Sequence, residues 1–377
     1  MSNYNIPQLP LPYDLETKEV LKQLNKANKK LAELKGIATT IPNENILIST
    51  LTLQEAKDSS EVENIVTTQD DLYKASVSLN DGFFSPATKE VLNYREAIQY
   101  GFALVRKKKL LTNNDIKVIQ EHLEHNRAGF RNVPGTSLKR SDGHIVYTPP
   151  QDSITINKLM SNLEFYINDK GLSDIDPLIK MAIIHHQFES IHPFFDGNGR
   201  TGRILNVLYL VINDLLDLPI LYLSRYITQN KGEYYRLIQA VRDKNVNNAD
   251  EWESWVIFML KAVESTATET IELVKGMSKL MSHYKNVLRP LLKKQYRHEI
   301  LNNLFFHPYT KIEYFMADTQ FQRKTAAKYL DLIVGAGLLT KMKIGRENYY
   351  INDRLVRLFM NRPENINNTG TVKTVSE

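Results

Sequence analysis

The 377-residue sequence contains no cysteine at all. This absence excludes disulfide bonds, thiol nucleophiles and zinc sites built on cysteine. The chain also lacks an apolar run long enough to span a membrane, and its polar start, Met1 to Asn5, lacks the pattern of a secretory signal. From the sequence we therefore expect a cytoplasmic protein with no membrane partner.

A strong excess of one charge is absent as well, because the formal net charge is only +5. The distribution of charge is more informative, since basic residues gather in the C-terminal third. They form two groups, Arg289, Lys293, Lys294 and Arg297, then Arg323, Lys324, Lys328, Lys341, Lys343 and Arg346. An apolar content of 42% is enough for real cores, and the length of 377 residues suggests two or three folded units.

The most informative segment of the chain is HPFFDGNGRTGR, residues 192–203. A buried helix is predicted before it, over 177–188, with Asp176 as N-cap and Pro177 in the first turn, and Pro193 ends that helix. A second apolar helix over 203–212 begins at the glycine turn. Free amide groups and the positive end of the helix dipole therefore converge at the turn, which predicts an anion site with phosphate as its guest.

The side chains of this segment suit a polyphosphate beside a base. Arg200 and Arg203 are three residues apart, so both can grip phosphates from one helix face. Asp196 would repel phosphate unless a cation lay between them, which makes it a candidate Mg²⁺ ligand. His192 is suited to take a proton from a hydroxyl near neutral pH.

Each of these features also has an ordinary explanation when it stands alone. A histidine before proline is usually structural, a glycine turn usually joins two elements, and two arginines one turn apart usually face solvent. Their combination within one short segment favours a functional site.

HPFFDGNGRTGR resembles the signature of the Fic family at every fixed position. The resemblance implies a mainly α fold, a helical core with a β-hairpin flap, and transfer of AMP from ATP to a hydroxyl of a target protein. It implies that His192 activates that hydroxyl and that Asp196 binds Mg²⁺. It assigns ATP binding to Gly197, Asn198, Gly199, Arg200, Thr201, Gly202 and Arg203.

Two further segments resemble parts of the same family. Residues 129–150 look like the flap that docks the target, with Ser141, Asp142 and Gly143 as the turn. The docking residues would be Ile145, Val146, Tyr147 and Thr148. Tyr234 and Tyr235 resemble the adenine-side helix, where an aromatic ring can pack on the base. An ordinary surface hairpin and a core tyrosine pair are the alternatives.

The segment from Ser59 to Asn64 resembles the family's inhibitory pattern, Ser/Thr-x-x-x-Glu-Gly/Asn. The resemblance implies that Ser59, Glu63 and Asn64 are regulatory and that Glu63 pairs with Arg203. Such a pair would remove a phosphate contact and repel the γ-phosphate. Ser60 and Glu63 also have the spacing of a capping box, so a plain helix cap is the alternative.

The remaining chain suggests four parts. Residues 1–85 form a regulatory segment whose first helix, with leucines from Leu21 to Leu34, is stopped by Gly36, and whose second helix covers 45–57. Residues 86–275 form the catalytic core, with helices near 88–104 and 114–125. Residues 276–362 form a linker helix and a winged helix-turn-helix domain, and residues 363–377 form a disordered tail.

The winged-helix prediction depends on an ordered series of elements. These are helices at 298–306, 309–317 and 323–336, followed by strands at 338–343 and 348–351. Gln322, Arg323, Lys324 and Lys328 could enter a DNA major groove, and Arg346 could contact phosphate from the wing. Winged helices also dock proteins, so both kinds of partner stay open.

Two classes of function therefore compete, an AMP-transferring enzyme and a DNA-binding regulator that senses nucleotide. The intact His192 favours transfer, because a sensor needs no base. Phosphorylation, as in the Doc branch of the family, is disfavoured because the Gly-Asn-Gly-Arg run is unaltered. Removal of AMP through Glu63 stays open, and the resemblance also implies self-modification and a homodimer.

Overall fold

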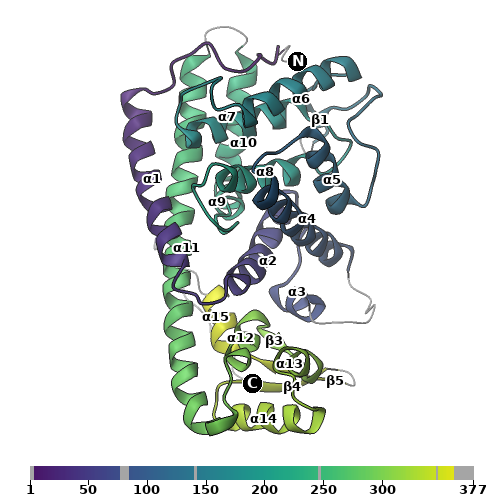
Figure 1. The fold of residues 1–377 in the computed structure, drawn as a ribbon. Helices are drawn as coiled ribbons and strands as arrows, with labels where there is room; N and C mark the ends of the chain where they lie inside the picture. The colour runs from purple at the N-terminus through teal and green to yellow at the C-terminus, as the bar shows by residue number, and fades with distance from the viewer. Residues whose placement is uncertain (1–3, 77–84, 140–141, 245–247, 345–346, 361–377) are drawn as a thin grey trace. The chain divides into compact units, whose positions relative to one another are not determined.

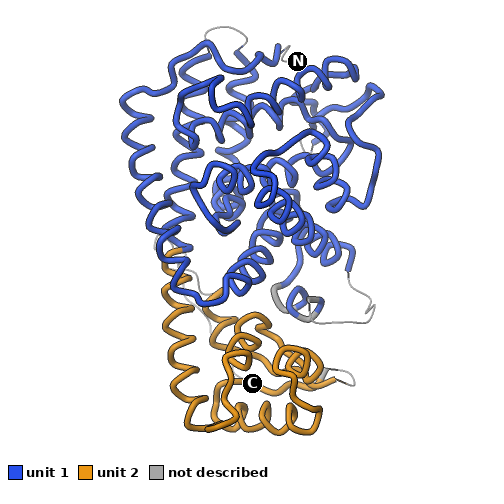
Figure 2. The backbone as a smooth tube through the Cα atoms, viewed as in Figure 1, with its two compact units in different colours: residues 1–270 blue, residues 271–377 orange. Residues whose placement is uncertain are grey.

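The structure is a computed structural model that describes residues 4–76, 85–139, 142–244, 248–344 and 347–360 (Figure 1). The predicted tail 363–377, Arg346 on the wing and Ser141 in the hairpin turn lie outside these residues. The chain divides into two compact units, residues 1–270 and 271–377 (Figure 2). The predicted regulatory segment, residues 1–85, belongs to the same compact unit as most of the predicted catalytic core.

The predicted mainly α architecture is confirmed. The first unit contains, in chain order, α1 (Lys18–Ala38), α2 (Glu44–Val62), α3 (Gln69–Ser76), α4 (Pro86–Lys108), α5 (Asn113–Glu124), β1 (Leu138–Lys139), β2 (Ile145–Tyr147), α6 (Ser153–Asn168), α7 (Pro177–Ile191), α8 (Asn198–Ile212), α9 (Ser224–Gln229) and α10 (Lys231–Asp243). Helix α11 (Ala249–Leu292) begins in this unit and ends in the next.

Two expectations for the N-terminal helices are wrong. Helix α1 does not stop at Gly36 but continues to Ala38, because Ala38 is buried and an exposed glycine inside a helix costs only about 0.5–1 kcal/mol. Helix α2 runs without a break through Ser59 and Ser60, and Glu63 is its C-cap. Ser60 therefore does not begin a helix, and the capping-box explanation of Ser60 and Glu63 fails.

The core of the first unit is built around α7 and α8. Every side chain of α7 from Leu178 to Ile191 is buried, which explains why the sequence of this helix shows almost no polar face. The predicted cap is present, since the Leu178 N–H donates to Asp176 Oδ1 at 2.8 Å. Helix α8 contacts α2, α4, α5 and α7, so the start of α8 is surrounded by four helices (Figure 1).

The predicted hairpin is present before α6. Strands β1 and β2 pair antiparallel, with Leu138 opposite Tyr147 and Lys139 opposite Ile145. Ile145 and Val146 are half-buried and Thr148 is exposed, whereas Tyr147 is buried.

The second unit has the predicted helices and two strands in the predicted order, with two differences. Residues 309–310, expected to begin the helix over 309–317, form a strand because they pair with residues 350–351, and a further helix follows the last strand. After the end of α11 come the short 3₁₀ helix η1 (Lys293–Gln295), α12 (His298–Phe306), β3 (Tyr309–Thr310), α13 (Ile312–Thr319), α14 (Arg323–Gly335), β4 (Thr340–Ile344), β5 (Glu347–Ile351) and α15 (Asp353–Met360). The three strands pair antiparallel in the order β3–β5–β4. The Tyr284 hydroxyl donates to Asn352 Oδ1 at 2.6 Å and ties α11 to the end of this sheet.

Candidate active site

The base candidate His192 lies at the C-cap of α7. Its backbone is left-handed, with φ 50°, and its N–H donates to the Phe188 carbonyl at 2.9 Å. Burial, with the nearby guanidinium groups of Arg242 and Arg131, lowers the pKa of His192 to about 3. The imidazole is therefore neutral at physiological pH, which is the form that can accept a proton.

The glycine turn follows His192 and begins α8. Gly197 has φ 78° and no side chain caps the helix, so the N–H groups of residues 198–200 have no acceptor within α8. The side chain of Asn198 fixes the loop, because its Oδ1 accepts from the Phe194 N–H and its Nδ2 donates to the Phe194 carbonyl, both at 2.8 Å. The turn thus offers backbone amides to an anion, as the sequence predicts.

Thr201 and Gly202, two residues of the predicted ATP-binding set, pack inside the protein. Thr201 is buried, and its N–H donates to the Gly197 carbonyl at 2.8 Å. Gly202 faces α7, where an added methyl group would lie 2.8 Å from Glu189 Oε1. Gly202 therefore permits the close packing of α8 on α7, and its place in the motif is explained by packing.

Arg203 is held by the end of α2. Its Nη2 donates to Glu63 Oε1 at 2.8 Å and to the Ser59 carbonyl at 3.0 Å, and its Nε donates to Ser59 Oγ at 2.8 Å. Burial is the largest single influence on the pKa of Arg203 and would lower it, but the Glu63 carboxylate together with Tyr234 and Tyr94 raises this pKa above its usual value. Ser59 and Glu63 of the inhibitory pattern thus meet Arg203 of the motif in one cluster.

The Glu63 carboxylate also occupies space at the anion turn. A methyl group on Gly199 would overlap Glu63 Oε1. Asn64 ends the segment in a left-handed conformation with φ 64°, which asparagine tolerates better than most residues, and its Oδ1 accepts from Lys231 Nζ at 2.9 Å. The end of α2 is therefore fixed where a phosphate would bind.

Arg200 has a different set of acidic partners. Its Nη1 lies 2.8 Å from Glu90 Oε2 on α4, and its Nη2 lies 2.8 Å from Glu124 Oε1 on α5. Burial raises the pKa of Glu124, against the attraction of Arg200. Glu90 and Glu124 could not be identified from the sequence, since neither lies in a recognisable motif.

Asp196 lies at the exposed edge of the turn, with its side chain 81% exposed. Its Oδ1 accepts from the Gly197 N–H at 2.7 Å, and its other oxygen is available to a ligand. No cluster of three or more metal-ligating side chains occurs among the residues that the structure describes. An exposed carboxylate beside an anion site fits Mg²⁺, which commonly binds one or two carboxylates together with substrate phosphates and water.

The two tyrosines of the adenine-side prediction separate. Tyr234 is buried, and its hydroxyl forms a hydrogen bond with His185 Nε2 at 2.9 Å. It therefore belongs to the core, and its predicted contact with the base is not available. Tyr235 is 46% exposed, and its pKa is raised by burial and then by the Glu63 carboxylate. Glu63 and Arg203 influence the pKa of both tyrosines, so both lie near the cluster at the end of α2, and they differ in exposure.

The side chain of Tyr147 packs inside the protein. Its hydroxyl donates to the Ser190 carbonyl at 2.8 Å, and the guanidinium of Arg242 lies 4.2 Å from its ring centroid. Its side chain is therefore held by α7 and α10, and only main-chain groups of this residue can meet a target. Ile145, Val146 and Thr148 keep exposed surface for docking.

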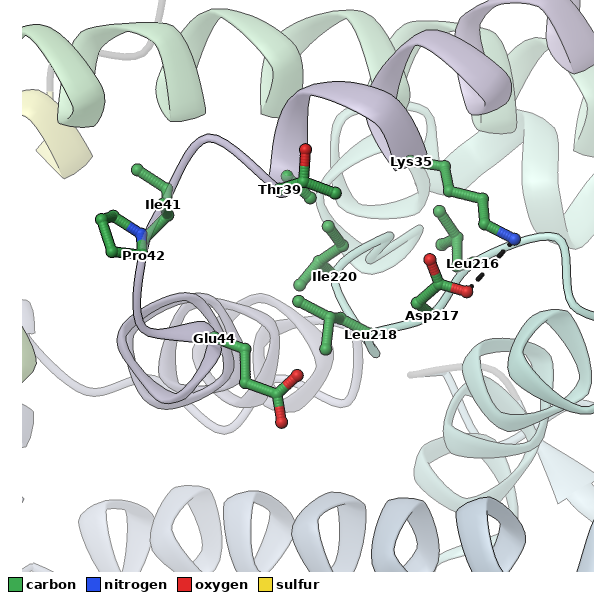
Figure 3. A pocket seen from close by; sticks show the side chains of 10 residues that line it. Lys35, Thr39, Ile41, Pro42, Glu44, Leu216, Asp217, Leu218 and Ile220 are labelled. Carbon is green, nitrogen blue, oxygen red and sulfur yellow. Dashed lines mark ion pairs between the residues drawn. The ribbon is translucent and has the colours of Figure 1, made fainter.

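A cavity of about 400 Å³ lies elsewhere in the first unit, between the end of α1, the connection to α2 and residues 216–220 (Figure 3). Its lining is largely apolar and includes Ile41, Leu218 and Ile220, while Lys35 pairs with Asp217 at 3.1 Å. None of the predicted site residues lines this cavity. The candidate active site is therefore the turn between α7 and α8.

Comparison with known proteins assigns most of the chain to family models. Residues 21–103 match the Fic/DOC family N-terminal model and residues 110–210 match the Fic/DOC family model. Residues 280–355 match the C-terminal domain of protein adenylyltransferase SoFic-like proteins. Among the described residues, no helix combines the length and apolar character needed to cross a membrane.

Curated relatives share the central part of the chain. A probable protein adenylyltransferase of Aquifex aeolicus is 32% identical over 186 residues, which are 47% of this chain and 53% of that protein. The protein adenylyltransferase Fic of Aedes aegypti is 27% identical over 172 residues, 44% of this chain and 32% of that protein. The chain thus matches about half or less of each relative.

A solved structure shares the fold. The crystal structure of a Fic family protein from Desulfovibrio desulfuricans G20 aligns with a TM-score of 0.56 and 19% identity, covering 90% of this chain and 97% of that one. Family models for the N-terminal region, the motif region and the C-terminal region thus follow one another along the sequence. With an intact motif, these matches identify the chain as a member of the Fic family.

Proposed function

We propose that this protein transfers AMP from ATP to a serine, threonine or tyrosine hydroxyl of a target protein and releases pyrophosphate. The observation that carries the proposal is the arrangement of the α7–α8 turn. A neutral His192 precedes a glycine turn with free amides, and two arginines follow within the first turns of α8. The names of the curated relatives support the same reaction.

In the proposed reaction the residues of this chain mainly position charge. The amides of residues 198–200 and the guanidinium groups of Arg200 and Arg203 hold the triphosphate. His192 takes the proton from the target hydroxyl, whose oxygen forms a bond to the α-phosphorus. The bond between the α-phosphorus and the bridging oxygen breaks, and pyrophosphate carries that oxygen away.

We also propose that Mg²⁺ binds together with ATP as its counter-ion. Asp196 would hold it, and the ion would neutralise phosphate charge near the exposed edge of the turn. A cytoplasmic setting, as expected from the sequence, also belongs to the proposal.

Inhibition by α2 is the second element of the proposal. With Glu63 on Arg203 and against Gly199, a bound ATP would meet a carboxylate where its terminal phosphate needs a cation. The wild-type protein is therefore expected to bind ATP in an unproductive position until the end of α2 moves. Release of AMP from modified targets through Glu63 can be measured in the same assay.

The reaction is tested with α-labelled ATP, Mg²⁺ and a cell lysate. We expect label on protein with the Glu63→Gly variant and none above background when His192→Ala is added to it. Removing a general base costs about 10²–10⁴-fold, whereas ATP binding should stay within twofold because the base does not hold the phosphates. Label at an equal rate in the His192→Ala variant would reject the base assignment.

For the second unit we propose a winged-helix module that binds DNA. The support is the order of its elements and two exposed lysines, Lys324 and Lys328, one turn apart on α14. Full-length protein with both changed to glutamine should lose about two units of salt slope in DNA binding. Lys26→Gln with Lys29→Gln, two exposed lysines on α1, is the matched control. No DNA binding at low salt would favour protein docking instead.

A further inference from the structure

Arg131 is a fully buried arginine at the start of the hairpin segment, with 0% of its surface exposed. Its hydrogen bonds all go to backbone carbonyls. Its Nε donates to the His192 carbonyl at 2.8 Å, and its Nη2 donates to the Pro150 carbonyl at 2.9 Å and to the Ile191 carbonyl at 3.5 Å. One guanidinium therefore joins the far end of the hairpin segment to the end of α7.

The backbone and the neighbouring ring strengthen this junction. The Arg131 N–H donates to the Pro193 carbonyl at 2.7 Å. The preceding residue, Phe130, packs on Phe194 of the motif with ring centroids 5.2 Å apart. Two successive residues of the hairpin segment are thus fastened to the loop that carries the base.

The physical need for a buried cation here follows from the end of α7. The last carbonyls of a helix have no partner within it, and the C-terminal end of the helix carries partial negative charge. His192 is also held in a left-handed conformation that non-glycine residues seldom adopt. Arg131 satisfies these carbonyls, and none of the ion pairs in the described part of the chain joins it to a carboxylate.

We infer that Arg131 is a positioning residue, which sets the hairpin against the His192 end of α7 so that a hydroxyl docked on the hairpin meets the imidazole. This inference rests on the proposed AMP transfer. Within the described residues the hydrogen bonds of Arg131 go to the carbonyls of residues 150 and 191–193 and none goes to the glycine turn, Arg200 or Arg203, so its role concerns the acceptor and not ATP. Its positive charge also disfavours a second positive charge on His192, whose pKa is lowered.

The test compares Arg131→Lys and Arg131→Met in the Glu63→Gly protein. Lysine keeps the charge but cannot form the planar fork, and methionine removes both. Arg127→Met is the matched control, because Arg127 is exposed and pairs only with Glu121 at the surface. Labelling of lysate proteins is followed over a range of ATP concentrations, and hydrogen–deuterium exchange is followed over residues 142–150 and 190–196.

For both Arg131 variants we expect the labelling rate at saturating ATP to fall about tenfold to a hundredfold, since small misplacement of reacting groups has effects of this size. The KM for ATP should stay within twofold, and exchange should rise together in both segments. A variant that labels at the control rate, or a KM for ATP that rises as much as the rate falls, would overturn the inference.

The exchange measurement separates this inference from the proposed function. If the parent protein labels nothing, AMP transfer fails, and coupled exchange of the two segments in Arg131→Lys still decides whether the junction exists. Unchanged exchange in that variant would reject the junction whatever the activity. If Arg131→Met does not fold, Arg131→Lys carries both readouts.

Discussion

Arg200 and Arg203 are one helical turn apart in the same motif, yet they are held in different ways. Arg203 is held by Ser59 and Glu63, which lie at the end of α2. Arg200 is held by Glu90 and Glu124 on α4 and α5, within the predicted catalytic core. One arginine of the motif is therefore held by a helix end that lies outside the predicted catalytic core, while the other is held by two helices of that core.

The comparison predicts opposite results for two glutamate substitutions. Glu63→Gly should raise AMP transfer by about tenfold to a hundredfold, since a charge-assisted hydrogen bond of about 1.5–3 kcal/mol no longer competes with phosphate. The measurement is the initial rate of labelling with α-labelled ATP. Glu61→Gly, at a more exposed position on the same turn, is the control. An equal rise in the control would mean that loosening α2, and not freeing Arg203, activates the protein.

Glu124→Gln should have the reverse effect. Arg200 would keep Glu90 but lose its buried partner, so the guanidinium would be placed less well for phosphate. We expect the transfer rate in the Glu63→Gly background to fall about fivefold, equivalent to about 1 kcal/mol. A rise in activity would show that Glu124 is a second inhibitor, and the contrast between the two arginines would then disappear.

Ser59→Ala tests how much the Ser59 hydroxyl contributes, apart from Glu63, to restraining Arg203. The variant removes the Oγ that accepts from Arg203 Nε but keeps the Ser59 carbonyl and the Glu63 pair. This bond runs from a charged guanidinium to a neutral hydroxyl, and the Ser59 carbonyl and Glu63 stay in place, so a rise in labelling of up to about fivefold is expected, equivalent to about 1 kcal/mol. Ser60→Ala is the control, because Ser60 Oγ has no hydrogen-bond partner and does not contact Arg203. No difference between the two variants would mean that Glu63 and the Ser59 carbonyl restrain Arg203 without help from the Ser59 hydroxyl.

A smaller effect, on stability, is expected from Glu55, a buried residue in the middle of α2. Burial raises the pKa of Glu55 from 4.5 to about 8, although the Ser224 and Tyr94 hydroxyls donate to it. The folded protein therefore binds this proton more tightly than the unfolded chain. The resulting stability is present below pH 4.5 and is lost as the pH rises toward 8.

The measurement is the melting temperature at pH 5 and pH 8. Wild-type protein should melt a few degrees lower at pH 8, since about 1 kcal/mol corresponds to about 2–4 °C in a protein of about 150–250 residues and to less in a larger one. Glu55→Gln should show a smaller difference, because glutamine does not titrate. If Glu55→Gln shows the same difference in melting temperature as the wild-type protein, other groups cause the pH dependence.

The sequence predicted the site well where its geometry is local. His192, the glycine turn and the arginines lie within one loop and the start of one helix, so helix ends and spacing suffice to bring them together. The pairing of Glu63 with Arg203 joins distant segments, and only the resemblance to Fic proteins indicated it. The place of Ser141 in the hairpin turn and the tail 363–377 stay predictions, because these residues lie outside the part of the chain that the structure describes.

The sequence failed where burial decides the role of a side chain. Tyr234 and Tyr235 are neighbours, yet one is a core residue and the other is half exposed, because α10 turns only one of them inward. Glu90, Glu124 and Arg131 carry no motif of their own, and their partners lie in other elements. Gly36 looked like a helix end, but the buried Ala38 beyond it extends α1.

The central claim is that Glu63 and the terminal phosphate of ATP compete for Arg203. Calorimetric titration of wild-type and Glu63→Gly protein with ATP and with ADP, each with Mg²⁺, tests it most directly. We expect Glu63→Gly to strengthen ATP binding about tenfold more than ADP binding, because only ATP carries the phosphate that meets Arg203. An equal increase in affinity for the two nucleotides, or no increase for either, would contradict this competition.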